Sequence, residues 1–123
     1  MEHQTITEEI IGCAFQVYNQ MGFGYLESVY GKCLIIELKK LELMVESQRQ
    51  IKVYYEGQLV GEFVVDLLVE DKIVVELKSV QKLNQAHEVQ LVNYLVSTGK
   101  SVGLLLNFGE NKVEVKRKVR DLK

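Results

Sequence analysis

The sequence contains no proline, no tryptophan and only two cysteines, Cys13 and Cys33. Because no Pro-, Gly- or Ser-rich stretch marks a linker, we expect residues 1–123 to form a single domain. No apolar run approaches the roughly 20 residues that cross a bilayer, and no cationic-then-apolar leader opens the chain. We therefore expect a cytoplasmic protein with no membrane partner, whose two cysteines stay reduced in the core rather than forming a disulfide or a zinc site.

Charge is unevenly distributed, although the formal net charge is only −2. Residues 1–46 carry seven acidic and three basic side chains, a net of −4, whereas residues 112–123 carry six basic and two acidic ones, a net of +4. A basic terminal stretch is compatible with phosphate binding, since neutralising phosphates releases counterions. It is equally compatible with an ordinary solvated strand. Net charge alone therefore does not identify a nucleic-acid-binding protein.

Hydrophobic periodicity predicts eight elements in the order ααβββαββ. Two amphipathic helices come first, the earlier over about 5–20 with Thr5 and Glu8 spaced as a capping box. The later helix has apolar positions from Leu26 to Leu41. The remaining elements are strands up to about residue 55, over 59–69 and over 73–78, a helix over 83–97 that packs through residues including Val89 and Val96, and strands over 102–108 and 113–119. This order predicts an α/β fold with a mixed central β-sheet flanked by helices.

The strand over 73–78 carries two charged side chains among apolar ones. Glu76 and Lys78 are two residues apart, so both point to the same face of the strand. If the turn at 70–72 has three residues, Asp66 on the preceding strand lies opposite Glu76, with Cβ atoms roughly 4.5–5.5 Å apart. A two-residue turn would instead send Asp66 to the other face. The three residues are also compatible with a simple ion-pair cluster on an exposed sheet face.

Two carboxylates this close repel each other unless one is protonated or a cation lies between them. A hard divalent cation such as Mg²⁺ or Mn²⁺ prefers oxygen ligands and resolves the conflict. The backbone carbonyl of Leu77 could add a further ligand. Lys78, beside such a metal, can stabilise charge that develops on a phosphate or orient an attacking water. The spacing of Asp66, Glu76 and Lys78 therefore predicts a metal site.

Polar residues on the predicted helices extend this hypothesis. Glu27 is a carboxylate on the first turns of the second helix, where it is also compatible with a simple interaction with the helix dipole. His87, Gln90 and Tyr94 are three and then four residues apart and share one helix face. Such a polar stripe beside a buried strand is either a solvated face or the wall of a cleft. We expect Tyr30 to pack in the core.

Together these motifs resemble the small bacterial and archaeal proteins called GxxExxY proteins, which are assigned to the PD-(D/E)XK nuclease superfamily. The resemblance covers most of the chain. It is carried by Gly22-Phe23-Gly24-Tyr25-Leu26-Glu27, by Asp66…Glu76-Leu77-Lys78, by His87-Glu88-Val89-Gln90 with Asn93-Tyr94-Leu95, and by Gly103–Gly109. The proline that the superfamily name places before the aspartate is absent, since Val65 stands there.

The resemblance implies a role for each matching position. Asp66 and Glu76 match the two metal-binding acids and Lys78 the catalytic lysine, whereas Glu27 is similar to a helical glutamate that completes or supports the metal shell. Gln90 and Tyr94 match a Q-x-x-x-Y spacing whose side chains position metal and substrate.

The function implied is hydrolysis of DNA or RNA with Mg²⁺ or Mn²⁺. The alternative is a non-catalytic nucleic-acid-binding or accessory module that keeps the fold, since fold does not imply function. A homo-oligomer or a protein partner stays open, because a small domain can borrow substrate contacts from a second subunit.

Overall fold

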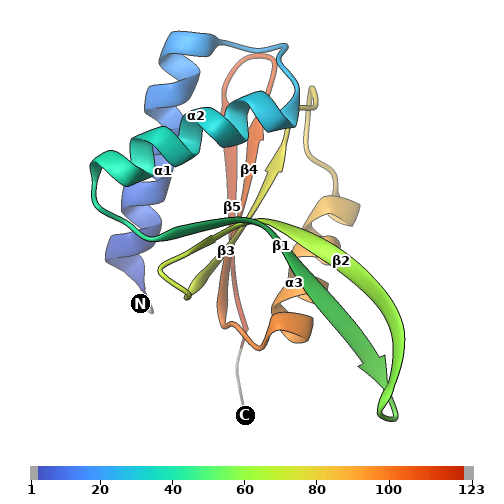
Figure 1. The fold of residues 1–123 in the computed structure, drawn as a ribbon. Coiled ribbons are helices and arrows are strands. Elements are labelled where there is room, and N and C mark those ends of the chain that lie inside the picture. Colours follow the sequence, from blue (N-terminus) through green and yellow to red (C-terminus); the bar gives the residue numbers. More distant parts are fainter. Residues whose placement is uncertain (1–2, 121–123) are drawn as a thin grey trace.

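The structure is a computed structural model that describes residues 3–120. It contains three helices and five strands in the predicted order ααβββαββ, which confirms the predicted fold class (Figure 1). The elements are α1 (Gln4–Met21), α2 (Glu27–Lys40), β1 (Val45–Tyr55), β2 (Gln58–Val69), β3 (Ile73–Lys78), α3 (Gln85–Thr98), β4 (Val102–Phe108) and β5 (Val113–Val119). No helix within the described range is long and apolar enough to cross a membrane.

The five strands form one mixed sheet in the order β1-β2-β3-β4-β5. The central β3–β4 pair is parallel and the other three pairs are antiparallel. A parallel pair requires a crossover connection, which α3 supplies between the two strands. As the unbroken apolar run of 102–108 predicts, every residue of β4 is buried. The sheet therefore holds its most apolar strand, β4, in an interior position, and β1 and β5 form its edges.

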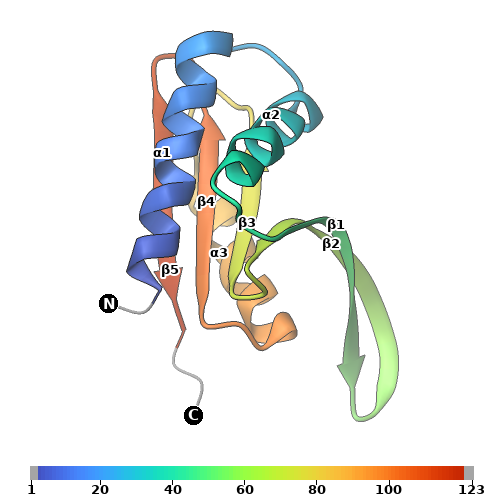
Figure 2. The same ribbon diagram turned by 60° about the vertical axis from the view of Figure 1, so that its left-hand side comes forward.

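Helices cover the sheet on both faces (Figure 2). Helices α1 and α2 pack on one face over the larger core, which includes Tyr30, Leu77 and Phe108. Helix α3 packs on the other face over a smaller core, to which it contributes Leu91 and Leu95. Burial of Tyr30 confirms its predicted place in the core. Because α3 has only this small core beneath it, Val89 and Val96 stay exposed, and their predicted packing is wrong.

The long β1–β2 hairpin extends away from the body as an arm (Figures 1 and 2). At the arm's tip Tyr54 and Tyr55 are exposed. Near its base the Phe63 ring stacks on Tyr94 of α3, with ring centroids 4.0 Å apart and planes 4° apart. The arm is therefore anchored to α3 at one end and free of the body at the other.

One local prediction about helix capping is wrong. Helix α1 begins at Gln4, so Thr5 lies inside its first turn and cannot cap it together with Glu8. The capping box in the structure is at α3 instead. There the Asn84 side chain accepts from the His87 N–H (3.3 Å), and His87 Nδ1 accepts from the Asn84 N–H (3.2 Å).

Candidate functional site

The site is built at the point where β2 leaves β3. The two strands pair at Leu67↔Val75, Leu68↔Val74 and Val69↔Ile73, which is the register that a three-residue turn predicts. In the turn, Glu70 and Asp71 both adopt positive φ angles, 56° and 54°. The ladder stops at Leu67, and beyond it β2 bends into the arm. Counting back along β2 from the turn, Asp66 is therefore the first residue whose backbone does not pair with β3.

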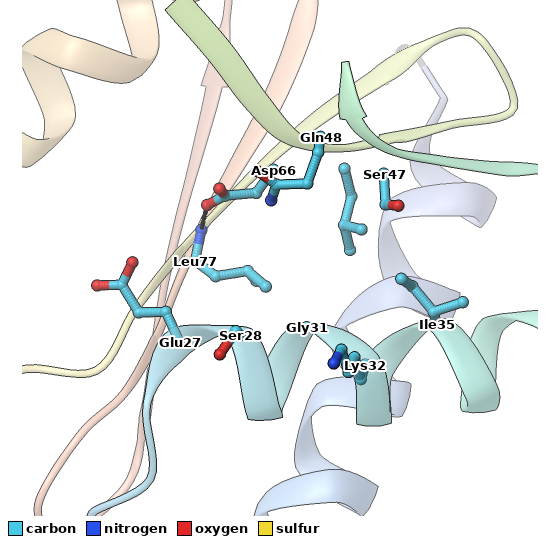
Figure 3. A pocket seen from close by; sticks show the side chains of 10 residues that line it. Glu27, Ser28, Gly31, Lys32, Ile35, Ser47, Gln48, Asp66 and Leu77 are labelled. Atoms are coloured by element: carbon cyan, nitrogen blue, oxygen red, sulfur yellow. Dashed lines mark hydrogen bonds between the residues drawn. The ribbon is translucent and has the colours of Figure 1, made fainter. Parts of the chain in front are cut away.

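Beyond the end of the ladder, two side-chain carboxylates accept hydrogen bonds from backbone N–H groups. The Leu77 N–H donates to Asp66 Oδ2 (2.8 Å; Figure 3), and the Asp66 N–H donates to Glu76 Oε1 (3.1 Å). Each carboxylate thus accepts a backbone donor from the other strand. This exchange fixes Asp66 and Glu76 beside one another and leaves one oxygen of each carboxylate outside these two bonds.

The pair is electrostatically unfavourable when both carboxyl groups are ionised. Glu76 is only 5% exposed. Burial, and after it the negative charge of Asp66, raises the pKa of Glu76 to about 8, against the opposing effects of the Asp66 N–H and the Lys78 ammonium. Burial also raises the pKa of Tyr94, and the charges of Glu76 and Asp66 add to this shift. At neutral pH the two carboxyl groups therefore share a site that favours holding one proton.

A cavity of about 390 Å³ adjoins this pair between α2 and the sheet. Asp66 and Leu77 line it from the sheet, and Glu27 and Lys32 line it from α2 (Figure 3). Glu27 is the first residue of α2 and reaches toward β3. Glu27, Asp66 and Leu77 therefore line the same cavity. The cavity brings residues from α2, β1, β2 and β3 to one place.

The other predicted residues lie around this centre. Lys78 is partly buried at the end of β3, two residues after Glu76 on the same side of the strand. Tyr94 lies on α3 close enough for the charges of both carboxylates to affect its pKa, and Gln90 is one turn earlier on the same helix. His87 is occupied in the α3 capping box. The structure thus gathers Asp66, Glu76 and the Leu77 backbone, and places the helical residues further out.

The donor set fits a divalent metal as a two-carboxylate core. All of its atoms are oxygens, which suit Mg²⁺ and Mn²⁺. Burial and, after it, the negative charge of Asp66 raise the pKa of Glu76, and a cation would offset the second of these effects. Among residues 3–120 no three His, Cys, Asp or Glu side chains converge closely enough to form a complete site. Glu27 therefore faces the cavity without closing a three-ligand shell.

Sequence reasoning missed a buried polar cluster that holds the segment after β3. Asn107, fully buried on β4, donates through Nδ2 to the Val80 carbonyl (2.9 Å) and to Glu114 Oε1 (2.8 Å), and its Oδ1 accepts from the Val80 N–H (3.0 Å). Glu114 also accepts from the Leu83 N–H (3.0 Å). The available signal was the single amide side chain inside the apolar run 102–108. This cluster braces the loop that follows Lys78.

Comparison with known proteins identifies the superfamily and agrees with the fold. A family model described as the PD-(D/E)XK nuclease superfamily matches residues 4–118. The chain belongs to this superfamily. The resemblance at superfamily level is thereby confirmed, while the narrower GxxExxY assignment stays a prediction.

A solved structure supports the fold of this PD-(D/E)XK chain. The crystal structure of SSO0001 is similar over 79% of the chain, with a TM-score of 0.59 and 18% sequence identity. The aligned part makes up 52% of SSO0001, so the present chain spans about half of that protein. At this identity the likeness concerns the fold alone. No curated protein matches the chain.

Proposed function

We propose that this PD-(D/E)XK protein is a metal-dependent nuclease that hydrolyses phosphodiester bonds of DNA or RNA in the cytoplasm. The observation that supports it most is the pairing of Asp66 and Glu76 at the bend of β2, within the fold of a nuclease superfamily. Ionising both carboxyl groups there costs free energy, and a hard divalent cation between them would remove that cost. The pair is therefore suited to holding a metal rather than to stabilising the fold.

In this proposal each residue has a distinct task. Asp66, Glu76 and the Leu77 carbonyl hold Mg²⁺ or Mn²⁺, and Glu27 completes or supports the shell. Such an ion, when bound, lowers the pKa of a coordinated water and neutralises phosphate charge. The Lys78 ammonium stabilises the charge that develops on the scissile phosphate.

Residues of α3 orient the site. The charges of Glu76 and Asp66 add to the raised pKa of Tyr94, and Gln90 lies one turn before Tyr94 on α3. The two side chains together position metal ligands and substrate. His87 acts indirectly, because its ring fixes the start of α3, the helix that carries Gln90 and Tyr94.

Metal binding is the first test. Titration calorimetry with Mg²⁺ and with Mn²⁺ should show saturable binding to the native protein and none to an Asp66→Asn/Glu76→Gln variant, which removes both charges and keeps the side-chain shapes. The matched control is Glu62→Gln/Asp71→Asn, because both of these carboxylates are exposed and lie outside the site. Equal binding to all three proteins would move the metal away from Asp66 and Glu76.

Lys78 provides a separate test of catalysis. Lys78→Met keeps most of the side-chain volume but removes the charge, so we expect metal-dependent cleavage to fall by about 100-fold or more while metal binding persists. Lys72→Met, on an exposed turn residue, is the control and should cleave at the native rate. Cleavage would be followed on labelled DNA and RNA oligonucleotides. Unchanged cleavage by Lys78→Met would contradict the assigned role.

One observation favours a second function, a binding or accessory module without useful cleavage. No third carboxylate or imidazole in the described chain closes the metal shell, and the formal net charge is −2. A nuclease that acts alone on long duplex normally presents a basic groove. Metal binding without any cleavage of DNA or RNA would select this alternative, with missing contacts supplied by a second copy of the chain or by another protein.

A further inference from the structure

An open groove lies next to the carboxylate site and is formed by residues 23–28 and Ser79. We call it the 23–28 groove. Its volume is about 620 Å³, within the range of roughly 300–1,000 Å³ that is typical of small-ligand sites. Glu27 and Ser28 line both this groove and the cavity that contains Asp66. A ligand bound in the groove would therefore continue directly into the proposed metal site.

The groove presents aromatic and aliphatic side chains to solvent. Phe23 is 39% exposed, Tyr25 46% and Leu26 75%, although all three belong to a short loop beside a buried core. Exposed apolar side chains that lie together in this way often mark a binding site. Apart from Glu27 the groove carries no charged side chain, and Lys78 immediately precedes Ser79 at its border. The groove thus exposes aromatic rings beside a single carboxylate, Glu27.

The loop that carries these rings is braced from several directions. The Tyr25 N–H donates to Tyr30 Oη (3.3 Å), the Tyr25 carbonyl accepts from Ser79 Oγ (2.7 Å), and the Tyr30 hydroxyl donates to the Gly22 carbonyl. The Tyr25 ring packs edge-on against Tyr30, with centroids 6.0 Å apart and planes at 86°. Tyr30 in turn stacks on buried Phe108. Tyr25 is therefore held in place before any ligand arrives, which lowers the entropy cost of binding.

We propose that the 23–28 groove binds the unpaired bases of a single-stranded nucleic acid, which stack on Tyr25 and Phe23 while the adjoining phosphate reaches the Asp66–Glu76 site. Base–aromatic stacking tolerates every base, because each base has a π-face. A duplex hides its base faces and would gain nothing from these rings. Delivery to the carboxylates rests on the proposed nuclease function, whereas base binding in the groove stands by itself.

The test measures binding without cleavage. Fluorescence anisotropy in EDTA would compare labelled oligothymidine and oligouridine strands with a duplex of equal length, so that DNA and RNA are separate arms. The test variant is Phe23→Ala/Tyr25→Ala. Its matched control is Tyr54→Ala/Tyr55→Ala, which removes two rings that are 59% and 68% exposed at the tip of the arm. Tyr25→Phe keeps the ring and should bind as the native protein does, which separates lost stacking from a disturbed loop.

We expect the native protein to prefer single strands and the Phe23→Ala/Tyr25→Ala variant to lose about 10-fold or more in single-strand affinity, with the control unchanged. Equal loss in both double variants, equal binding of duplex and single strand, or no binding by the native protein would overturn the proposal. Lys78-dependent cleavage with unaltered binding by the groove variant would overturn it and leave the nuclease function intact. Binding lost in the groove variant, with no cleavage of any substrate, would support the groove and reject the nuclease.

Discussion

Two glutamates on either side of β4 show how one side chain acquires opposite properties. Glu114 on β5 is partly desolvated, which raises its pKa, but the hydrogen bonds from Asn107 and from the Leu83 N–H outweigh this and leave the pKa lowered. Glu76 on β3 is buried opposite Asp66, and its pKa is raised to about 8. Glu114 accepts from two donors, whereas Glu76 accepts from one backbone N–H and lies beside the Asp66 carboxylate. The first arrangement satisfies its carboxylate within the fold, and the second is the one that we propose holds a cation.

The two arrangements are linked through β4. In the sheet register Asn107 pairs with Lys78 on one side and with Glu114 on the other. The satisfied cluster therefore braces the strand end that carries Lys78 and the loop that leads to α3. A rigid support next to a strained carboxylate pair is what a preorganised site needs. The comparison predicts that damage to the first arrangement costs stability, whereas damage to the second costs function.

The largest loss of stability is expected at Asn107. Asn107→Ala leaves the Val80 N–H and carbonyl and the Glu114 carboxylate without their amide partner in a buried place, so the free energy of unfolding should fall by about 3 kcal/mol. Urea unfolding followed by circular dichroism measures this change. The control is Asn111→Ala on an exposed turn residue. A loss of less than about 0.5 kcal/mol at Asn107 would show that water replaces the amide.

Glu76→Gln should raise the free energy of unfolding, whereas Asn107→Ala lowers it. The unfolded state releases the Glu76 proton near the ordinary pKa and the folded state keeps it to about pH 8, so native stability falls as pH rises between these values. The variant has no proton to lose. Without metal it should therefore gain on the native protein as pH rises, by about 2 kcal/mol at pH 6 and by more at higher pH.

Thermal unfolding from pH 4.5 to pH 9 in EDTA measures this gain, with Glu62→Gln as the exposed control. Adding Mg²⁺ should stabilise the native protein and leave the variant unchanged. A pH-independent difference between the two proteins would argue that Glu76 is ionised throughout.

The smallest effect is expected for Glu114→Gln. The new amide oxygen can still accept from Asn107 and from the Leu83 N–H, so the loss at pH 7 should be less than about 1 kcal/mol. The sign of its pH dependence is reversed relative to Glu76. The stabilisation by ionised Glu114 is present above the unfolded-state pKa and is lost as pH falls through the lowered folded-state pKa. Unfolding curves at pH 7 and pH 3 should therefore differ for the native protein more than for Glu114→Gln.

The sequence predicted what depends on local rules. The two-residue period of β3 put Glu76 and Lys78 on one face, and the three-residue turn set the register beside Asp66. Both rules act over a few residues, so no knowledge of the remaining fold was needed. Burial of β4 followed in the same way from its continuous apolar run.

Long-range features were out of reach. Asn107 was visible as a polar residue in an apolar strand, but its partners Val80 and Glu114 meet it only through the loop after β3 and the pairing of β5. The capping box at Asn84 escaped notice because His87 supplies a ring nitrogen where the usual pattern has Glu or Gln. The end of the β2–β3 ladder at Leu67 has no local signal either, because it depends on how the arm bends.

Because of that bend, Asp66 lies at the point where the arm joins the body of the protein. The arm runs roughly 25 Å from Asp66 to its tip at the rise of an extended strand, whereas Glu76 is fixed to the body on β3. The Phe63–Tyr94 ring stack fixes the base of the arm against α3 close to this point. One member of the carboxylate pair thus lies on the strand that continues into the arm, and the other lies on a strand inside the sheet. The relative position of the two carboxylates therefore depends on where β2 bends away from β3.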